Sequence, residues 1–332
     1  MKKTLKKLGM ILSLTACVGM LAGCGGAKQE QQAANGEKVY KIGINQFADH
    51  PSLDNCRLGF IDGLKEAGYE EGVNVEFLYD NGMADTGITN QIAQNYVANK
   101  CDLICGIATP AAQASYNAAE GKVPVIYTAV SDPVAAGLAD ENGLGKAATG
   151  TSDVLPLEKQ VEMIRAFLPE AKTIGVLYST SEANSVAHIA RLEEIVDDYG
   201  FTLVTVGVTN ASEIPMAADN ILGKVDCLNN LTDNTIVSSL SVILDKANAK
   251  GIPVFGSEIE QVKNGCAAAE SIDYYQLGVQ TGKMAARVLD GEDINTMPFE
   301  AIKDSATVIN SKVLEVMGIT LDENMTVTDV IE

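Results

Sequence analysis

The sequence predicts an α/β protein made of two lobes, each built around a doubly wound parallel sheet. Short apolar runs alternate with amphipathic stretches along most of the chain, which is typical of parallel βαβ units. This alternation occurs twice, in a run that begins near residue 39 and in another that begins near residue 150. The chain has 332 residues, enough for about two domains at ~150 residues each.

One stretch, residues 102–113 (DLICGIATPAAQ), shows the repeating unit most clearly. Leu103, Ile104 and Ile107 predict a short buried strand, and the small residues that follow predict a helix. Thr109 suits the N-cap of that helix and Pro110 suits its first turn. The end of the strand and the first N–H groups of the helix would then face one point, where open α/β sheets bind ligands.

The first run predicts four strands and three helices in alternation. Helix 52–68 has an apolar face that includes Leu53, Phe60 and Leu64, and Gly68 would end it. Helix 86–99 places Ile88, Ile92 and Tyr96 on one face by the same spacing. The strands are predicted at 39–46, 73–79, 103–107 and 123–128, and the third helix begins at Thr109.

The second run continues the same pattern from a helix at 157–168, which Pro169 would end. Strands are predicted at 173–178, 202–208, 225–231 and 253–256. Helices are predicted at 184–199, 211–222, 235–250 and 273–289, the last closed by Gly291. Two lobes of similar size would leave a cleft between them.

Charge and cysteine content exclude several classes of protein. The formal net charge of −20 argues against nucleic acid and anionic polymers as partners, although solubility alone would explain it. The five cysteines beyond residue 24 form no CxxC pair, so we interpret them as small buried apolar residues. His50 and His188 are the only histidines and have no metal-ligand spacing, so we expect no metal and no cofactor.

The N-terminus has the organisation of a bacterial lipoprotein leader. Four lysines precede an apolar stretch at 8–20 that is short for a membrane span, and the sequence Leu-Ala-Gly-Cys ends at Cys24. We expect residues 1–23 to be a signal peptide, Cys24 to be lipidated, and the polar residues 24–37 to form a flexible tether. The alternative is an ordinary signal peptide in which this cysteine occurs by chance.

Polar residues follow the predicted strands and define the candidate ligand site. Hydroxyls, amides and single carboxylates of this kind also serve as helix N-caps, so capping alone remains an alternative at each loop. Six such loops facing one cleft favour a binding site. The candidates are Gln46, Phe47, Thr109, Pro110, Ala111, Ser131, Asp132, Tyr178, Ser181, Glu182, Ala183, Asn184, Ser185, Thr232, Asp233, Asn234, Glu258, Asp273 and Tyr274. His50 could also touch the ligand, or it could simply be a turn residue before proline.

The residue types at these loops indicate a zwitterionic ligand with an apolar or aromatic side chain. All four arginines fall inside predicted helices, so helix N-termini and hydroxyls would hold a carboxylate. Asp132 and Asp233 could bind an ammonium group, and Phe47, Tyr178 and Tyr274 offer aromatic faces. We expect Asp233 to bind the ammonium, with Thr109 and the loop 181–185 at the carboxylate; pure helix capping by Asp233 is the alternative.

Catalysis has little support in the sequence. It contains no GxSxG motif, no plausible Ser-His-Asp arrangement and no glycine-rich phosphate loop that opens a helix. We therefore expect a binding protein and not an enzyme. A hydrolase on the same scaffold, and a sensor that presents its ligand to a membrane receptor, are the alternatives.

Six motifs together resemble one family, the lipoprotein-type solute-binding proteins of ABC importers, in the branch that includes tryptophan/tyrosine importer binding proteins. They are INQFADHPSLD (44–54), IATPAAQ (107–113), AVSDPVAAGL (129–138), GVLYSTSEANS (175–185), LTDNTIVSSL (231–240) and IDYYQLGVQTGKMAARVL (272–289). The resemblance covers about residues 39–297.

This resemblance implies a type I periplasmic-binding-protein-like fold whose two lobes are joined by a three-crossing hinge and close on the ligand. Lobe one would comprise 38–152 and 273–296, and lobe two 153–272 and 297–320. It also implies an extracytoplasmic, membrane-anchored monomer that delivers an aromatic or large apolar amino acid to an ABC permease and its ATPase. Another small solute remains an alternative ligand.

Overall fold

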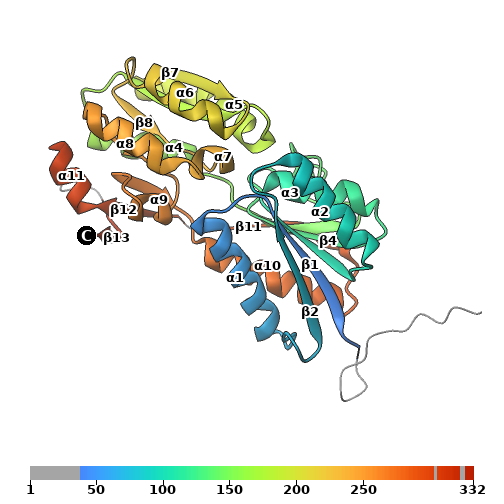
Figure 1. The fold of residues 1–332 in the computed structure, drawn as a ribbon. Helices are drawn as coiled ribbons and strands as arrows, with labels where there is room; N and C mark the ends of the chain where they lie inside the picture. Colours follow the sequence, from blue (N-terminus) through green and yellow to red (C-terminus); the bar gives the residue numbers. More distant parts are fainter. Residues whose placement is uncertain (1–37, 303–304, 322–325) are drawn as a thin grey trace, which may run out of the picture.

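A computed structural model describes residues 38–302, 305–321 and 326–332, and it confirms the two-lobed α/β class (Figure 1). The expected signal peptide, Cys24 and the tether lie outside the described residues. We call the half with the six-stranded sheet lobe one and the other half lobe two. No helix of the described part of the chain has the length and apolar character needed to cross a membrane.

Lobe one is organised around a wholly parallel sheet with the strand order β11-β5-β4-β3-β1-β2. Gln46 pairs with Ile107, which in turn pairs with Thr128, so three strands end at one edge. The strands are β1 (Tyr40–Gln46), β2 (Val75–Asn81), β3 (Leu103–Ile107), β4 (Val125–Thr128), β5 (Ala148–Ser152) and β11 (Glu300–Ala301).

Two pairs of helices cover the two faces of this sheet (Figure 1). The helices α1 (Pro51–Glu66) and α10 (Tyr274–Leu289) pack on one face, and α2 (Thr86–Ala98) and α3 (Thr109–Ala119) on the other. Glycines allow α1 and α10 to meet backbone to backbone: a Cβ atom added at Gly278 would lie 2.2 Å from the carbonyl oxygen of Cys56. The late helix therefore returns to lobe one, far from its neighbours in sequence.

Lobe two contains a parallel sheet of order β7-β6-β8-β9 and a smaller sheet of order β10-β12-β13. The pairing of β10 with β12 is antiparallel, so this lobe is not built from parallel strands alone. Its strands are β6 (Thr173–Ser179), β7 (Thr202–Val208), β8 (Cys227–Asn229), β9 (Val254–Phe255), β10 (Ala268–Ser271), β12 (Ala306–Asn310) and β13 (Asp329–Ile331).

The helices of lobe two mostly follow the prediction, but some of the predicted helices are divided in two. The predicted helix 235–250 is two helices separated at residues 238–239, and the Ser238 hydroxyl donates to the carbonyl of Asn234 at this break. The helices are α4 (Leu157–Phe167), α5 (Ala183–Ile195), η1 (Val196–Tyr199), η2 (Ala211–Glu213), α6 (Ile214–Ile221), α7 (Asn234–Val237), α8 (Leu240–Lys250), α9 (Ile259–Lys263) and α11 (Ser311–Met317); η3 (Ile294–Thr296) belongs to lobe one.

The chain passes from one sheet to the other at three places, after β5, before α10 and after β11. The third passage was expected at residue 297 and lies later. Glu300 pairs with Thr151, which adds β11 to the edge of the first sheet, and the next strand, β12, belongs to lobe two. Residues 297–301 therefore belong to lobe one, because β5 offers an unpaired edge there.

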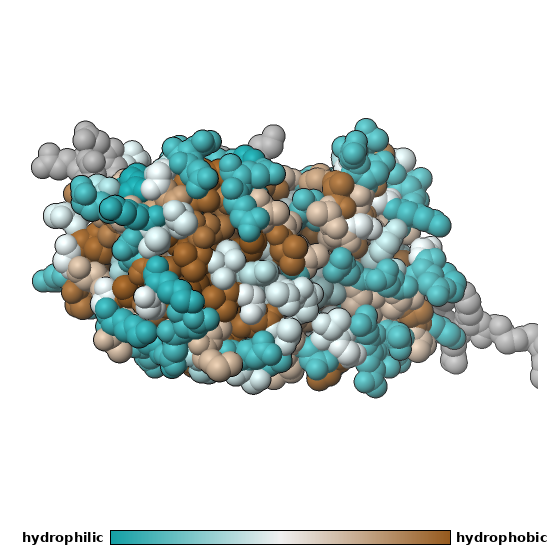
Figure 2. Space-filling model, turned by 90° about the horizontal axis from the view of Figure 1, so that it is seen from above, coloured by the Kyte–Doolittle hydropathy of each residue, from teal (hydrophilic) through white to brown (hydrophobic). Residues whose placement is uncertain are grey.

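One face of lobe two carries apolar surface (Figure 2), although the protein as a whole is acidic. Seen from above, apolar surface gathers over this half of the molecule (Figure 2). Strand β7 (TLVTVGV) is an edge strand, and Met216 on the neighbouring helix α6 is 74% exposed.

Candidate functional site

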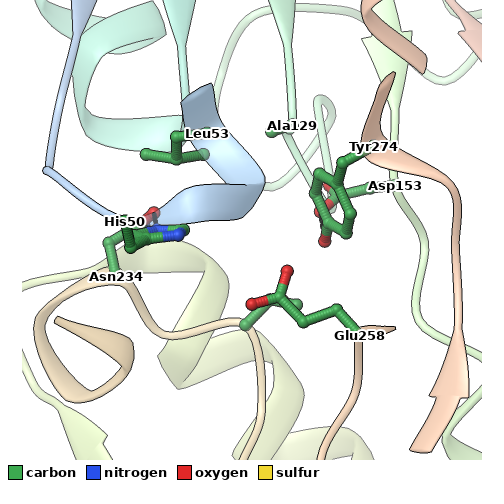
Figure 3. A pocket seen from close by; sticks show the side chains of 8 residues that line it. His50, Leu53, Ala129, Asp153, Asn234, Glu258 and Tyr274 are labelled. Atoms are coloured by element: carbon green, nitrogen blue, oxygen red, sulfur yellow. Dashed lines mark hydrogen bonds between the residues drawn. The ribbon is translucent and has the colours of Figure 1, made fainter. Parts of the chain in front are cut away.

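A small cavity lies between the lobes, at the edge where the strands of both main sheets end (Figure 3). Its volume is about 10 Å³, room for one group the size of a water molecule. The residues that line it come from both lobes and from the passages between them: His50, Leu53, Ala129, Asp153, Thr232, Asn234, Glu258 and Tyr274.

Asp153 brings a carboxylate to the cavity from the first passage between the lobes. It is 2% exposed, and its Oδ2 accepts a hydrogen bond from the hydroxyl of Tyr274 at 2.6 Å. Its Oδ1 has no hydrogen-bond partner among the described residues. Burial raises the pKa of this carboxyl group to about 6, because the charged form loses its hydration.

Glu258 supplies a second carboxylate from the N-terminus of α9. It is also 2% exposed, and its Oε1 accepts a hydrogen bond from Nε2 of Gln261 at 3.1 Å. Burial raises its pKa to about 7, and the negative charge of Asp153 adds to this shift. Figure 3 shows Asp153, Tyr274 and Glu258 pointing toward one another across the cavity.

His50 faces the same space with an unprotonated ring nitrogen. Its Nε2 lies 3.3 Å from Oδ1 of Asn234, whose Nδ2 donates to the carboxylate of Glu182 at 2.6 Å. Because a carboxylate only accepts, the Asn234 oxygen must face His50, and Nε2 must carry the proton. Burial lowers the pKa of His50 to about 4, so the ring is neutral and its buried Nδ1, which no described group contacts by a hydrogen bond, is an acceptor.

The backbone at this edge of lobe one is held in unfavourable conformations. Ala108 (φ 77°) and Ala129 (φ 53°) follow β3 and β4 directly, and both have the left-handed φ values that non-glycine residues avoid. Such residues cost on the order of 1–3 kcal/mol each and cluster where a ligand is held.

Three buried polar atoms of residues that line the cavity lack hydrogen-bond partners. Oδ1 of Asp153, Nδ1 of His50 and Oγ1 of Thr232 are buried, and none has a hydrogen-bond partner in the part of the chain that the structure describes. A compact cation with several N–H groups would satisfy these atoms and neutralise the buried carboxylates.

Several residues predicted from the sequence lie at this cavity or beside it. Thr232, Asn234, Glu258 and Tyr274 line it. Ser131 and Asp132 line an adjacent groove. Asn234 and Tyr274 open helices and Glu258 is the N-cap of α9, whereas Ser131, Asp132 and Thr232 lie in loops a few residues after β4 and β8.

Asp233 has the capping role that was the alternative to ammonium binding. Its Oδ1 accepts the N–H of Ile236 at 2.9 Å, and its Oδ2 accepts the N–H of Ser179 at 2.5 Å. Glu182 also binds the start of α7, through the N–H groups of Asn234 and Thr235. Burial and the nearby Glu182 charge raise the pKa of Asp233 well above its usual value. Both of its oxygens are used within lobe two.

Four further candidates have structural roles away from the cavity. The amide of Gln46 binds Ala48, Asp54 and Arg57 within lobe one, and Phe47 is 2% exposed in the core. Asp273 is exposed and caps α10 by accepting the N–H of Gln276. Tyr178 lies within β6, where its ring covers Gly207 of the next strand.

The first turns of α3 and α5 hold the remaining candidates. Thr109 was expected as the N-cap, but Ala108 takes that position, and the buried Oγ1 of Thr109 finds no partner among the described residues. Asn184 donates to the carbonyl of Thr232. Ser181 bonds to the hydroxyl of Ser179. Pro110, Ala111, Ala183 and Ser185 complete these two turns.

Asp153 was missed because its strand was missed. Strand β5 (ATGTS) carries no large apolar residue, yet all of it is buried beneath α10 and beside β4. The position of Asp153 directly after a strand would have made it a candidate site residue. The strand itself could not be predicted, because it has no run of large apolar residues.

Other sequence predictions concern metal and cysteine chemistry. In residues 38–302, 305–321 and 326–332 no group of three metal-ligand side chains comes together. The five described cysteines are buried and free, as expected for small apolar residues. The arginines all lie in helices, as the sequence indicated.

Comparison with known proteins assigns the class. The model of the family described as ABC transporter substrate binding protein matches residues 41–330, so the chain belongs to this family. The chain is 37% identical over 323 residues to the "Tyrosine-binding protein" of Clostridioides difficile (strain R20291), covering 96% of this chain and 93% of that protein.

Two solved structures bear on the arrangement of the lobes. An ABC domain from Streptococcus pneumoniae in complex with L-Trp is 36% identical, with a TM-score of 0.85 over 89% of this chain and all of that one. A ligand-free, open substrate-binding protein from Clostridium difficile is 38% identical, with a TM-score of 0.66 over 88% of this chain and 99% of that one. At nearly equal identity, this structure as a whole is more similar to the L-Trp complex than to the ligand-free, open protein, and we call its arrangement of lobes closed.

Proposed function

We propose that this protein binds a free aromatic amino acid between its lobes and delivers it to the permease of an ABC importer. The observation that carries the choice of an amino acid is the cavity of acceptors formed by Asp153, Glu258 and His50, which fits an α-ammonium group. The names of the tyrosine-binding relative and of the L-Trp complex support an aromatic side chain.

The α-carboxylate has a complementary place at the first turn of α3. The free Oγ1 of Thr109 and the N–H groups that begin the helix lie at the same sheet edge as Ala129, which lines the cavity. A helix N-terminus favours an anion. One ligand would thus be held by both lobes, which explains why binding would stabilise closure.

We expect the purified protein to bind L-tyrosine or L-tryptophan in isothermal titration calorimetry and not to bind their α-keto analogues, which have the carboxylate and ring but no ammonium. myo-Inositol is a control for non-amino-acid solutes. Binding of the keto analogues with the affinity of the amino acids would contradict the ammonium assignment, and no binding of any aromatic amino acid would contradict the proposed function.

We also propose that lipidation of Cys24 anchors the protein outside the cytoplasm. The basic leader, apolar stretch and Leu-Ala-Gly-Cys order support this proposal. In a bacterial host, Cys24→Ser should move the protein from the membrane fraction to the soluble fraction. Cys17→Ser, within the leader, is the matched control and should leave it in the membrane; equal membrane retention of both variants would refute the anchor.

A further inference from the structure

A second space, lined by segments that continue from the lining of the cavity, is large enough for an aromatic ring. This groove has a volume of about 500 Å³, within the range of small-molecule sites. Ala129 and Asp153 line the cavity, while Ser131 and Leu155, two residues further along the same segments, line the groove.

The groove has apolar residues from both lobes in its walls, together with the charged Asp132, Glu158 and Arg191. Pro133 and Phe299 come from lobe one, Leu157 comes from lobe two, and Leu155 comes from the passage between them. A ring placed here would contact both lobes in the closed arrangement. The cavity itself has room only for the ammonium, so the side chain of the proposed ligand must occupy another space.

One polar side chain in the groove lacks a partner. His188 of α5 is 7% exposed and lines the groove, and no hydrogen bond from the described residues reaches its ring nitrogens. Burial lowers its pKa to about 4, although the carboxylate of Asp132 opposes this shift, so the ring is neutral. A neutral imidazole has one nitrogen that accepts a hydrogen bond.

We propose that His188 selects ligands whose aromatic ring carries a hydrogen-bond donor, with the ring in this groove and the phenol O–H of tyrosine or the indole N–H of tryptophan bonded to the imidazole. This inference rests on the proposed function and specifies its ligand class. Phenylalanine has the same apolar ring but leaves His188 unpaired, so it should bind more weakly.

The test measures the affinities of L-tyrosine, L-tryptophan and L-phenylalanine by calorimetry for the wild type, His188→Phe and His188→Gln. We expect the wild type to bind tyrosine and tryptophan about fivefold or more tightly than phenylalanine, which corresponds to ~1 kcal/mol. In His188→Phe this preference should disappear while phenylalanine still binds. His188→Gln, whose amide can still accept a hydrogen bond, should keep a preference.

Binding of phenylalanine by a variant shows that its fold and its ammonium cavity are intact. If His188→Phe does not fold, the affinities of the wild type still test the inference, because equal affinities for tyrosine and phenylalanine would overturn it. An unchanged preference in His188→Phe would overturn it as well. If the wild type binds none of the three amino acids, the proposed function fails and this inference fails with it; binding of all three with equal affinity refutes only the role of His188.

Discussion

Glu258→Gln should weaken the binding of an aromatic amino acid by about ten- to hundredfold. The substitution keeps the size of the side chain but removes the charge that would pair with the ligand's ammonium. Hydrogen bonds to charged groups contribute roughly 1.5–3 kcal/mol net, and 1.4 kcal/mol is a tenfold change in affinity. Calorimetry measures the effect. Glu141→Gln, an exposed carboxylate remote from the cavity lining, is the control and should bind like the wild type.

The pH dependence gives this prediction a second readout. The pKa of Glu258 is raised from 4.5 to about 7, so the folded, ligand-free protein holds this proton more tightly than the unfolded chain does. The corresponding stabilisation is present below about pH 4.5 and is lost as the pH rises through about 7. Ligand affinity should change in the opposite direction, rising between pH 6 and 8 as the carboxylate becomes charged.

In Glu258→Gln the contribution of this group to both trends should vanish, which leaves the dependences from Asp153, Asp233 and the buried His50 and His188. Thermal unfolding of the ligand-free protein and calorimetry at several pH values test this together. Affinity within a factor of two of the wild type, with an unchanged pH profile, would remove Glu258 from the site.

Gly278→Ala should destabilise the protein by about 3 kcal/mol, because the new Cβ has no space between α1 and α10. It would lie 2.2 Å from the Cys56 carbonyl oxygen and 2.9 Å from the Phe60 nitrogen, both of which are backbone atoms that a rotamer change cannot move. The helices would have to separate, and Tyr274, which begins α10 and binds Asp153, would move with them.

Urea unfolding monitored by circular dichroism measures this loss. Gly223→Ala is the matched control, because its Cβ would meet no atom within 4 Å and should leave the midpoint nearly unchanged. Equal midpoints for Gly278→Ala and the wild type would show that the two helices do not meet as closely as described.

Local sequence patterns were sufficient to predict the strands and helices that have a clear pattern of apolar residues. The strand at 103–107 and the helix after Pro110 are both observed, because buried β-branched and apolar residues and a proline in the first turn specify them locally. Strand β5 and the two-residue strand β11 had no such pattern. Both strands form through contacts between segments distant in sequence or at the edge of the sheet. Strand β5 pairs with β4 and packs against α10, and β11 pairs with β5.

The carboxylates show the same division between local and long-range information. Asp233 and Glu258 both follow a strand and precede a helix, so the sequence could not separate capping from ligand binding. The fold assigns Asp233 to the N–H groups of Ser179 and Ile236 and leaves Glu258 facing Asp153, a residue 105 positions earlier, across the cavity.

The sequence by itself determined the α/β class, the two lobes, the edge at which the site lies and the family, because these follow from periodicity, strand–helix junctions and continuous motifs. Only the tertiary structure decided which polar groups remain without partners. That outcome depends on atoms brought together from distant segments: Glu182 orients Asn234, Asn234 sets the tautomer of His50, and the packing of the two lobes buries the polar atoms that remain without partners among the described residues.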